Sequence, residues 1–425
     1  MRGSHRTALA IAISLLVAFG LEGASARAAD PGDLDRSFGA NGRKTVNFGH
    51  LEIAWDVALQ ARKPILAGWT LVETGGCCDD GPINIALARL RPGGRLDSSF
   101  GQGGKKRTRR GALAAYAVAV QDNGKIVVAG GSCYVMRFKP EGAVDRRFGE
   151  GGIARPNLDP EANPRCRSLA LQDDGRIVVA GYQYRPATGN SPVVLRYRRG
   201  GRLDESFAGD GQATAVLPEA MTVEDLAIQP DGRILVAGGT FAVARYTSRG
   251  EPDTSFSGDG IVFTDIVPGA FDNAEGIALS EDGIVVGGTT DTDGGTSDFA
   301  LARYDLDGNL DLGFGGGGIQ LTDFRNGGLD DAWGIAAQRD GKIVLAGSTD
   351  SRGKSQDFAL ARYLPDGTLD PSFSQNGKAV TAFRRRGRGR GVRDVAYGVA
   401  VDRQERILAV GSSGKDFAVA RYHGG

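Results

Sequence analysis

Residues 335–381 read IAAQRDGKIVLAGSTDSRGKSQDFALARYLPDGTLDPSFSQNGKAVT, and this stretch decides the fold because close copies of it recur along the chain. Three signatures follow one another in it: an apolar run that ends at Gly347, the string FALARY with Arg362, and the string LDPSF that ends at Phe373. Apolar residues alternate within the runs and turn-forming pairs separate them, which is typical of short β-strands. One copy therefore predicts four antiparallel strands.

Each signature occurs seven times, at intervals that average about 57 residues, close to the period of propeller blades. The glycine is found at Gly68, Gly130, Gly181, Gly238, Gly288, Gly347 and Gly411. The arginine is found at Arg89, Arg137, Arg196, Arg245, Arg303, Arg362 and Arg421, and the phenylalanine at Phe38, Phe100, Phe148, Phe207, Phe256, Phe314 and Phe373. The sequence predicts an all-β fold, a seven-bladed β-propeller with four strands per blade.

The two ends of the chain favour a closed ring over an open solenoid. The last copy stops soon after Arg421, before a third signature and a fourth strand, and residues 34–48 contain these two missing parts. An N-terminal strand that completes the C-terminal blade would remove an exposed sheet edge. We expect residues 29–425 to form a single propeller closed in this way, with Asn-Gly and Asp-Gly pairs making type I′ hairpins between the first two strands of most blades.

The alternating apolar string, the FALARY motif, PDGxLDxSFG and GxxxT together resemble the bacterial delta-sixty repeat, over essentially all of the chain after residue 28. The chain is similar, more distantly, to NHL-type propeller repeats. The resemblance implies an exported bacterial β-propeller module without an established activity, and it brings no catalytic residues.

Residues 1–28 have the features of a secretory signal peptide: basic Arg2 and Arg6, an apolar run over residues 8–21, and a small-x-small site that ends at Ala28. We expect cleavage near Ala28 and a secreted, periplasmic or cell-envelope protein. The apolar run is too short to span a membrane comfortably, and no later stretch approaches the required length. We therefore expect no transmembrane segment, and a monomer.

Basic and acidic residues are balanced, with 51 of each, which gives no reason to expect a nucleic-acid partner. Two basic clusters, residues 105–110 and 384–390, stand out from this background. We interpret them as solvated loops, with an anionic partner as the alternative.

A residue that occurs seven times indicates scaffold, because chemistry usually happens at one place. The arginines of the second signature and the aspartates of the LD pairs are therefore expected to form ion pairs within or between adjacent blades. The aspartates are Asp35, Asp97, Asp145, Asp204, Asp253, Asp311 and Asp370. The turn from Asp305 to Asp311 resembles part of a calcium loop but lacks the full ligand set, so we expect neither a metal nor a cofactor.

The copies differ most at the start of their first strand, which would be innermost in a propeller. Aligned on the following alanine, this position holds Trp55, Tyr116, Arg167, Glu224, Glu275, Trp333 and Tyr397. Around a ring the four aromatic residues are contiguous and the three charged residues occupy the other arc. We expect these residues to surround one mouth of the central channel, where they could bind a carbohydrate, a peptide or a protein; the alternative is packing between blades.

Acidic residues three positions earlier share this face: Glu52, Asp272, Asp330 and Asp394. They could bind a cation, although capping of turns is the favoured interpretation.

The chain has four cysteines: Cys77, Cys78, Cys133 and Cys166. Export and an even count favour disulfides. Because adjacent cysteines do not easily bond to each other, we expect Cys77 and Cys78 each to pair with one of Cys133 and Cys166. A zinc site is disfavoured by the absence of a CxxC motif.

Catalysis has little support in the sequence. After removal of the signal peptide only His50 and His423 remain, and neither belongs to a recognisable triad or acid–base motif. We therefore predict a non-enzymatic binding or interaction scaffold. The alternative is a hydrolase or lyase that acts on a polysaccharide through Glu224 and Glu275, because two carboxyl groups across a cleft can cleave a glycosidic bond.

Overall fold

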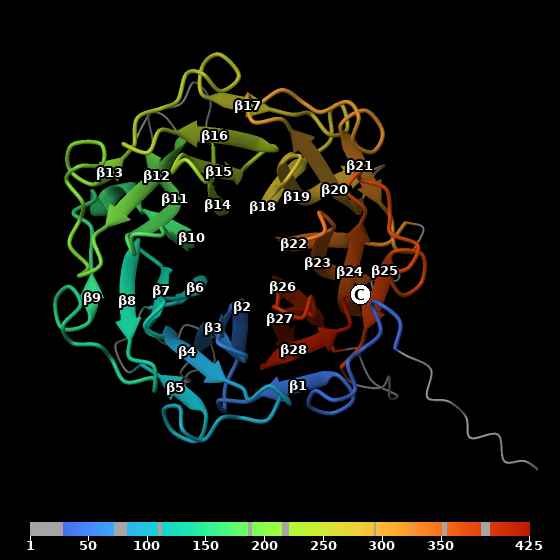
Figure 1. Cartoon of the computed structure of the whole chain (residues 1–425), viewed down its shortest axis with the longest axis horizontal. Helices are drawn as coiled ribbons and strands as arrows, with labels where there is room; N and C mark the ends of the chain where they lie inside the picture. Colours follow the sequence, from blue (N-terminus) through green and yellow to red (C-terminus); the bar gives the residue numbers. More distant parts are fainter. Residues whose placement is uncertain are drawn as a thin grey trace, which may run out of the picture.

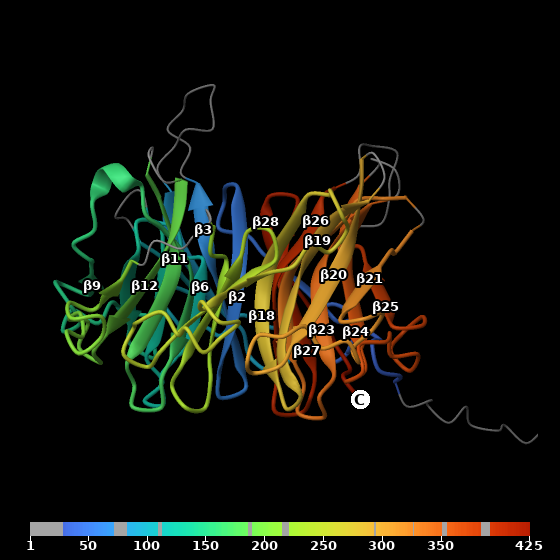
Figure 2. The same ribbon diagram turned by 90° about the horizontal axis from the view of Figure 1, so that it is seen from above.

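The computed structural model describes residues 29–71, 83–108, 113–185, 189–214, 221–292, 295–325, 327–350, 355–383 and 392–425. These residues form a ring of seven four-stranded antiparallel sheets (Figure 1). The first strand of each sheet lies nearest the central axis and the fourth lies at the rim, and the side view shows the blades side by side around the ring (Figure 2). The prediction of a seven-bladed propeller is confirmed.

Blades 1 to 6 are each made of four consecutive strands. Blade 1 has β2 (Glu52–Gln60), β3 (Lys63–Leu71), β4 (Ile83–Arg89) and β5 (Lys105–Arg107). Blade 2 has β6 (Ala117–Val120), β7 (Ile126–Gly130), β8 (Tyr134–Phe138) and β9 (Ile153–Ala154). Blade 3 has β10 (Arg165–Leu171), β11 (Ile177–Arg185), β12 (Gly189–Tyr197) and β13 (Gln212–Ala213).

Blades 4 to 6 repeat this order. Blade 7 combines the first strand of the chain with the last three. Blade 4 has β14 (Asp225–Ile228), β15 (Ile234–Gly238), β16 (Ala242–Tyr246) and β17 (Ile261–Phe263). Blade 5 has β18 (Asp272–Ser280), β19 (Gly283–Thr292), β20 (Thr296–Tyr304) and β21 (Ile319–Thr322). Blade 6 has β22 (Asp330–Ala337), β23 (Ile343–Asp350), β24 (Gln356–Tyr363) and β25 (Lys378–Thr381). Blade 7 has β26 (Asp394–Val401), β27 (Ile407–Ser413), β28 (Asp416–Tyr422) and β1 (Arg43–Val46).

The hydrophobic core lies between the blades. In β23, Ile343 and Leu345 pack toward blade 5, whereas Val344 and Ala346 pack toward blade 7. Successive side chains of a strand point to opposite faces, and both faces of each blade are covered by a neighbour. This is why each second strand contains a continuous apolar run.

Most turns between the first and second strands differ from the prediction. Gly124 has a φ of 77°, but the preceding Asn123 is not in the left-handed region. The amide of Gly124 donates to the carbonyl of Gln121, and the amide of Gln121 donates to that of Lys125. This is the longer loop in which a type I turn is followed by one left-handed residue, so the type I′ assignment was wrong.

The ring is closed by the strand that the sequence indicated. Strand β1 pairs with β28 in antiparallel register, from Arg43 opposite Ala420 to Val46 opposite Phe417. The amide of Asp35 also donates to the carbonyl of Arg421 at 2.8 Å. The predicted closure is confirmed.

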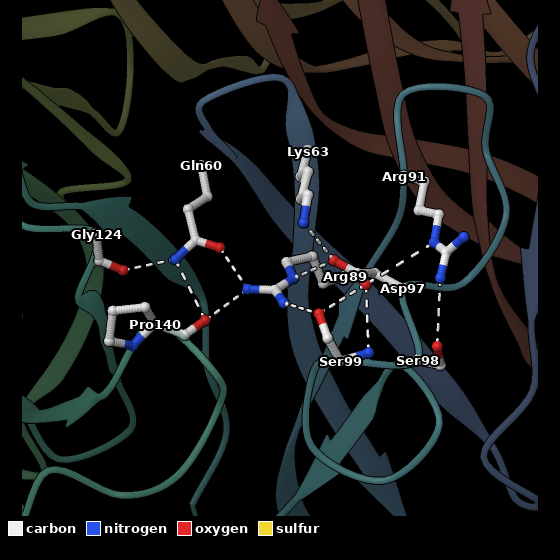
Figure 3. Close-up of polar contacts among 9 residues, drawn as sticks. All are labelled: Gln60, Lys63, Arg89, Arg91, Asp97, Ser98, Ser99, Gly124 and Pro140. Atoms are coloured by element: carbon white, nitrogen blue, oxygen red, sulfur yellow. Dashed lines mark hydrogen bonds and ion pairs between the residues drawn. The ribbon is translucent and has the colours of Figure 1, made fainter.

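The repeated arginine and aspartate form the expected ion pair in every blade. In blade 1, Arg89 Nε lies 3.0 Å from Asp97 Oδ2 (Figure 3). The Arg89 guanidinium also stacks 4.8 Å above the centroid of the Phe100 ring. Arg89 Nη1 donates at 2.5 Å to the carbonyl oxygen of Pro140 in blade 2. The arginine therefore contacts two repeated residues of its own blade, Asp97 and Phe100, and one carbonyl of the next blade.

The other six blades have the same arrangement, with distances of 4.5 to 4.7 Å between the guanidinium carbon and the centroid of the phenylalanine ring. In blade 3, burial acts to raise the pKa of Asp204, but hydrogen bonds from Ser206 and the charges of Arg196 and Arg176 hold it below its usual range. Each aspartate is thus an ionised part of the scaffold, as its repetition indicated.

One disulfide is present among the described residues, and it corrects the predicted pairing. Cys133 lies in the short turn between β7 and β8, and Cys166 lies in β10 of the next blade, with their Cα atoms 4.7 Å apart. The short turn brings Cys133 directly against the start of β10, where the amide of Cys166 donates to the carbonyl of Gly131. The two cysteines therefore bond to each other, while Cys77 and Cys78 lie outside the described residues.

The helical content of the described residues is the single turn η1 (Pro160–Ala162), and no helix there is long and apolar enough to cross a membrane.

Candidate ligand-binding site at the channel mouth

The seven unequal residues occupy an irregular position in the first strand of each blade. In five blades the pairing with the second strand skips one residue there, and that residue is Trp55, Arg167, Glu275, Trp333 or Tyr397. In the other two blades, Tyr116 and Glu224 immediately precede β6 and β14, and their amides donate to Ala129 and Ala237 at 2.9 Å. A β-bulge of this kind redirects a side chain.

These residues, which we call the mouth ring, line one cavity of about 190 Å³ on the channel axis. All seven positions that the sequence singled out therefore converge at one place. A cavity of this size is below the roughly 300 to 1,000 Å³ of typical small-molecule pockets. It can hold one small group, such as a single side chain or sugar unit.

The aromatic residues of the mouth ring form a continuous arc. The ring centroids of Trp55 lie 4.5 Å from those of Tyr397 and 5.3 Å from those of Tyr116, and Trp333 lies 5.4 Å from Tyr397. The rings meet in tilted or edge-to-face geometry, which is an arrangement that aromatic pairs prefer. The four residues thus pack against one another and also line the cavity, and whether they bind a ligand stays a prediction.

The charged arc is held together by Arg167. Its guanidinium lies 4.6 Å from the centroid of the Tyr116 ring, and its Nε lies 3.4 Å from Glu224 Oε2. Side-chain exposures of 25% for Arg167 and 18% for Glu224 leave both partly accessible from the channel. Burial raises the pKa of Glu224, although the charge of Arg167 opposes this.

Glu275 occupies the other end of the charged arc. Burial is the main cause that raises its pKa to about 9, and repulsion from Glu224 adds to it. The amide nitrogen Nδ2 of Asn273 donates to its Oε1. At neutral pH Glu275 is therefore protonated.

Two further carboxyl groups line the cavity one residue deeper, and sequence reasoning missed them. Asp56 accepts hydrogen bonds from the amides of Val57 and, at 2.8 Å, Val118 of blade 2. Asp225 accepts from Ser168 Oγ of blade 3 at 2.7 Å and from the amide of Ile277 of blade 5 at 3.0 Å. These carboxyl groups join neighbouring blades, and burial raises the pKa of Asp56 to about 7.

A comparison of this deeper position between copies would have shown the two aspartates. The other five blades have Ala117, Ser168, Gly276, Gly334 and Gly398 there.

The acidic residues three positions before the mouth ring cap turns, as the favoured interpretation held. Glu52 accepts from the amides of Phe48 and His50, and Asp272 accepts from that of Ile266. Asp330 and Asp394 accept from the amides of Phe324 and Phe383.

Asp330 also lies beside Asp298 and Asp323, with one carboxylate oxygen of each within 4.8 Å of the others. Oxygen donors of this kind suit a hard cation, but three are fewer than the six to eight oxygens that Ca²⁺ takes. The turn at Asp305 shows no such grouping, because its carboxylate accepts hydrogen bonds from Asp307 and Asn309 of the same turn.

The basic clusters are described only in part. Lys105 Nζ donates at 2.8 Å to the carbonyl of Asn47 and lies over the ring of Phe48. Both residues directly follow β1, the strand that closes the ring. Residues 109–110 and 384–390 lie outside the described residues.

No curated protein matches this chain in sequence. Among solved structures, the WD40 beta-propeller domain of Doa1 is similar at 13% identity with a TM-score of 0.50, over 90% of this chain and 97% of that one. Raptor from Chaetomium thermophilum is similar at 11% identity with a TM-score of 0.54, over 90% of this chain and 29% of that one. At these identities the likeness shows the fold alone.

Four of the repeats match a family model. Residues 172–207, 229–256, 281–314 and 338–373 match a family model, and these segments fall in blades 3 to 6. The family is described as "Domain of unknown function (DUF5122) beta-propeller", and it is this domain that the four repeats match.

Proposed function

We propose that this protein is an exported, non-enzymatic β-propeller that binds one small polar group of a carbohydrate or peptide at the mouth ring. The observation that carries the proposal is that all seven unequal residues line one cavity. The repeated arginines, aspartates and phenylalanines are instead engaged in contacts within and between blades. Variation that is greatest at one concave position is what a binding site on a repeated scaffold requires.

Export rests on the expected signal peptide of residues 1–28, and the finer relationship to the delta-sixty repeat rests on the motifs quoted above. Both are parts of the proposal. The resemblance to that repeat agrees with an exported module without an established activity.

The absence of an enzymatic role is supported by the position of the two histidines. Neither His50 nor His423 lines the mouth cavity. The amide of His50 donates to Glu52, and His423 Nε2 lies 3.9 Å from Asp35 Oδ1 at the closure. Neither histidine is placed to move a proton at the mouth ring.

The polysaccharide hydrolase or lyase is a second candidate, because of the protonation of Glu275. A protonated carboxyl beside a second carboxyl group is the pairing that glycosidic cleavage uses, with the first as general acid. Glu224, however, is paired with Arg167 and does not stand free as a base or nucleophile.

Binding to glycan and peptide arrays tests the proposal with three proteins. We expect the wild type to bind a subset of the array, Trp333→Ala to lose at least about tenfold in affinity, and Phe271→Ala to bind as the wild type does. Phe271 is a matched control because it is an aromatic residue that is 67% exposed and does not line the cavity. Thermal melts would show that both variants are folded.

The outcomes separate the two candidates. An empty array, or equal binding by the wild type and Trp333→Ala, would overturn the binding proposal. Release of new reducing ends from a polysaccharide that is abolished in Glu275→Gln would establish the second candidate instead.

A further inference from the structure

The mouth ring has two places where its charged arc meets its aromatic arc. At the first, Arg167 is sandwiched between an acid and an aromatic ring, with Glu224 on one side and Tyr116 on the other. A guanidinium over an aromatic face is attracted by the ring quadrupole, and a carboxylate adds a charged partner. The chain itself therefore supplies the cation at this junction.

The second junction has the acid and the aromatic ring but lacks the cation. Glu275 of blade 5 and Trp333 of blade 6 are neighbours in the mouth ring and line the same cavity. Arg167 is the one basic residue among the described residues that line this cavity. The two junctions thus differ in one component.

The carboxyl groups around the cavity leave one acid for a ligand cation, at the second junction. Four carboxyl groups line the cavity: those of Asp56, Glu224, Asp225 and Glu275. Asp56 and Asp225 are occupied by backbone amides and Ser168, and Glu224 is occupied by Arg167. This leaves Glu275, whose hydrogen bond comes from a neutral amide.

We propose that the ligand group bound at the mouth ring is a cation, a primary ammonium or a guanidinium, held between Glu275 and Trp333 as Arg167 is held between Glu224 and Tyr116. The inference rests on the proposed function and gives the chemical class of its ligand. A lysine or arginine side chain of a peptide has such a group at the end of an apolar stem, which can lie along the aromatic arc.

Binding of this cation is coupled to a proton. The charged groups that face Glu275 are Glu224, Arg167, Asp331 and Asp225, and the protonated state of Glu275 follows from its burial and the three carboxyl groups. When an ammonium enters, Glu275 ionises, its proton passes to solvent, and an ion pair replaces the neutral acid. The affinity should therefore rise about tenfold per pH unit between pH 6 and 8, where the free acid is protonated and the bound one is ionised.

Isothermal titration calorimetry with a lysine probe tests the inference. The probe is Nα-acetyl-lysine methylamide, and its control is the same compound acetylated on Nε, which has no charge. Titrations at pH 6.5 and 7.5, each in two buffers of different ionisation enthalpy, give both the affinity and the number of protons released. We expect about one proton released per probe bound, about tenfold tighter binding at the higher pH, and at least tenfold weaker binding of the acetylated control.

Two variants test whether Glu275 is the group that releases the proton. Glu275→Gln keeps the shape of the side chain but cannot ionise, so it should lose the proton release and the pH dependence. Glu281→Gln, an exposed position in the turn after β18, should keep both.

The outcomes distinguish failure of the inference from failure of the proposed function. Binding of neutral array ligands that requires Trp333, together with no preference for the charged probe, would leave the binding site in place and overturn the cation. Binding of the charged probe without proton release, or equally by Glu275→Gln, would also overturn it. An array and probes that all fail to bind would overturn both proposals.

Discussion

Gly347 lies opposite the bulge that contains Trp333, and a Cβ atom at this glycine would lie 1.9 Å from the carbonyl oxygen of Asp331. The same close approach occurs at the equivalent glycine of every blade, at 1.8 to 2.3 Å from the corresponding carbonyl. A glycine inside a strand often marks such an approach of one backbone to another. The glycine that ends each apolar run is therefore what permits the bulge that carries the mouth ring.

Replacement of this glycine by alanine should be costly although the backbone angle is ordinary. For Gly347→Ala we expect a loss of about 1 to 3 kcal/mol in the free energy of unfolding, because the backbone must shift to admit the methyl group. Urea unfolding measures this. Gly200→Ala is the control, since nothing lies within 4 Å of its added Cβ atom, and equal stability of the two variants would contradict the prediction.

Glu275 should make stability depend on pH. Its pKa is raised from an ordinary value of 4.5 to about 9, so the folded state holds the proton more tightly than the unfolded state does. Its contribution to stability is complete below about pH 4.5 and declines as the pH rises toward 9, by up to about 1.4 kcal/mol per unit. Glu275→Gln cannot ionise and should gain stability relative to the wild type over this range.

Urea unfolding at pH 5, 7 and 9 measures the difference between the two proteins. Glu281→Gln gives the reference for loss of an exposed carboxyl group. If the curves of wild type and Glu275→Gln stayed parallel from pH 5 to 9, the raised pKa would be wrong.

At the scale of the element, the third strand of each blade carries the arginine that joins one blade to the next. Three arginines of blade 3, Arg176, Arg196 and Arg198, reach the carboxylate of Asp204, and a comparison of Arg196 with Arg198 isolates this role. Arg196 Nε lies 2.9 Å from Asp204 and Arg196 is 5% exposed, whereas Arg198 Nε lies 3.3 Å from Asp204 and Arg198 is 57% exposed. Only Arg196 also donates to the carbonyl of Ser248 in blade 4 and stacks on Phe207.

Loss of the buried arginine should therefore matter far more than loss of the exposed one. We expect Arg196→Ala to cost about 3 to 5 kcal/mol, because it leaves Asp204 buried without its main partner. Arg198→Ala should cost at most about 1 kcal/mol, as is usual for exposed pairs. Equal free energies of unfolding for the two variants, measured with urea, would show that the inter-blade contact is not important.

The elements differ in how far they could be predicted from sequence. Repetition made the strands, the blade number and the mouth ring predictable, because seven copies show which positions vary. The Cys133–Cys166 bond could not be predicted, because it depends on how closely a turn of blade 2 approaches β10. The grouping of Asp298, Asp323 and Asp330 was missed for a similar reason, since β20 and β22 belong to different blades.

At the scale of the molecule, the closure of the ring holds the mouth ring together, because β26 of blade 7 lies beside β2 of blade 1 in the aromatic arc. Phe38 and Val46 pack into the core between these two blades. Removal of residues 34–48 should therefore lower the melting temperature by more than about 5 °C, given that loss of one buried phenylalanine already costs about 3 to 5 kcal/mol.

Thermal melting monitored by circular dichroism measures this effect. A synthetic peptide of residues 34–48, added to the truncated protein, should restore part of the lost stability by pairing with β28. A truncated protein that melts at the temperature of the full ring would contradict the role of β1.

The pairing of β1 with β28 also has a consequence for the order of folding. Arg421 and Asp35 are 386 residues apart in sequence, whereas the contacts within blades 1 to 6 are local. Blades 1 to 6 can form in succession as the chain emerges, but the seventh must wait until the last strands are available. Contacts of such long range are slow to form, so we expect the ring to spend the final stage of folding as an open arc of six blades, with its rate of completion limited by the search of one short strand for the other end of the chain.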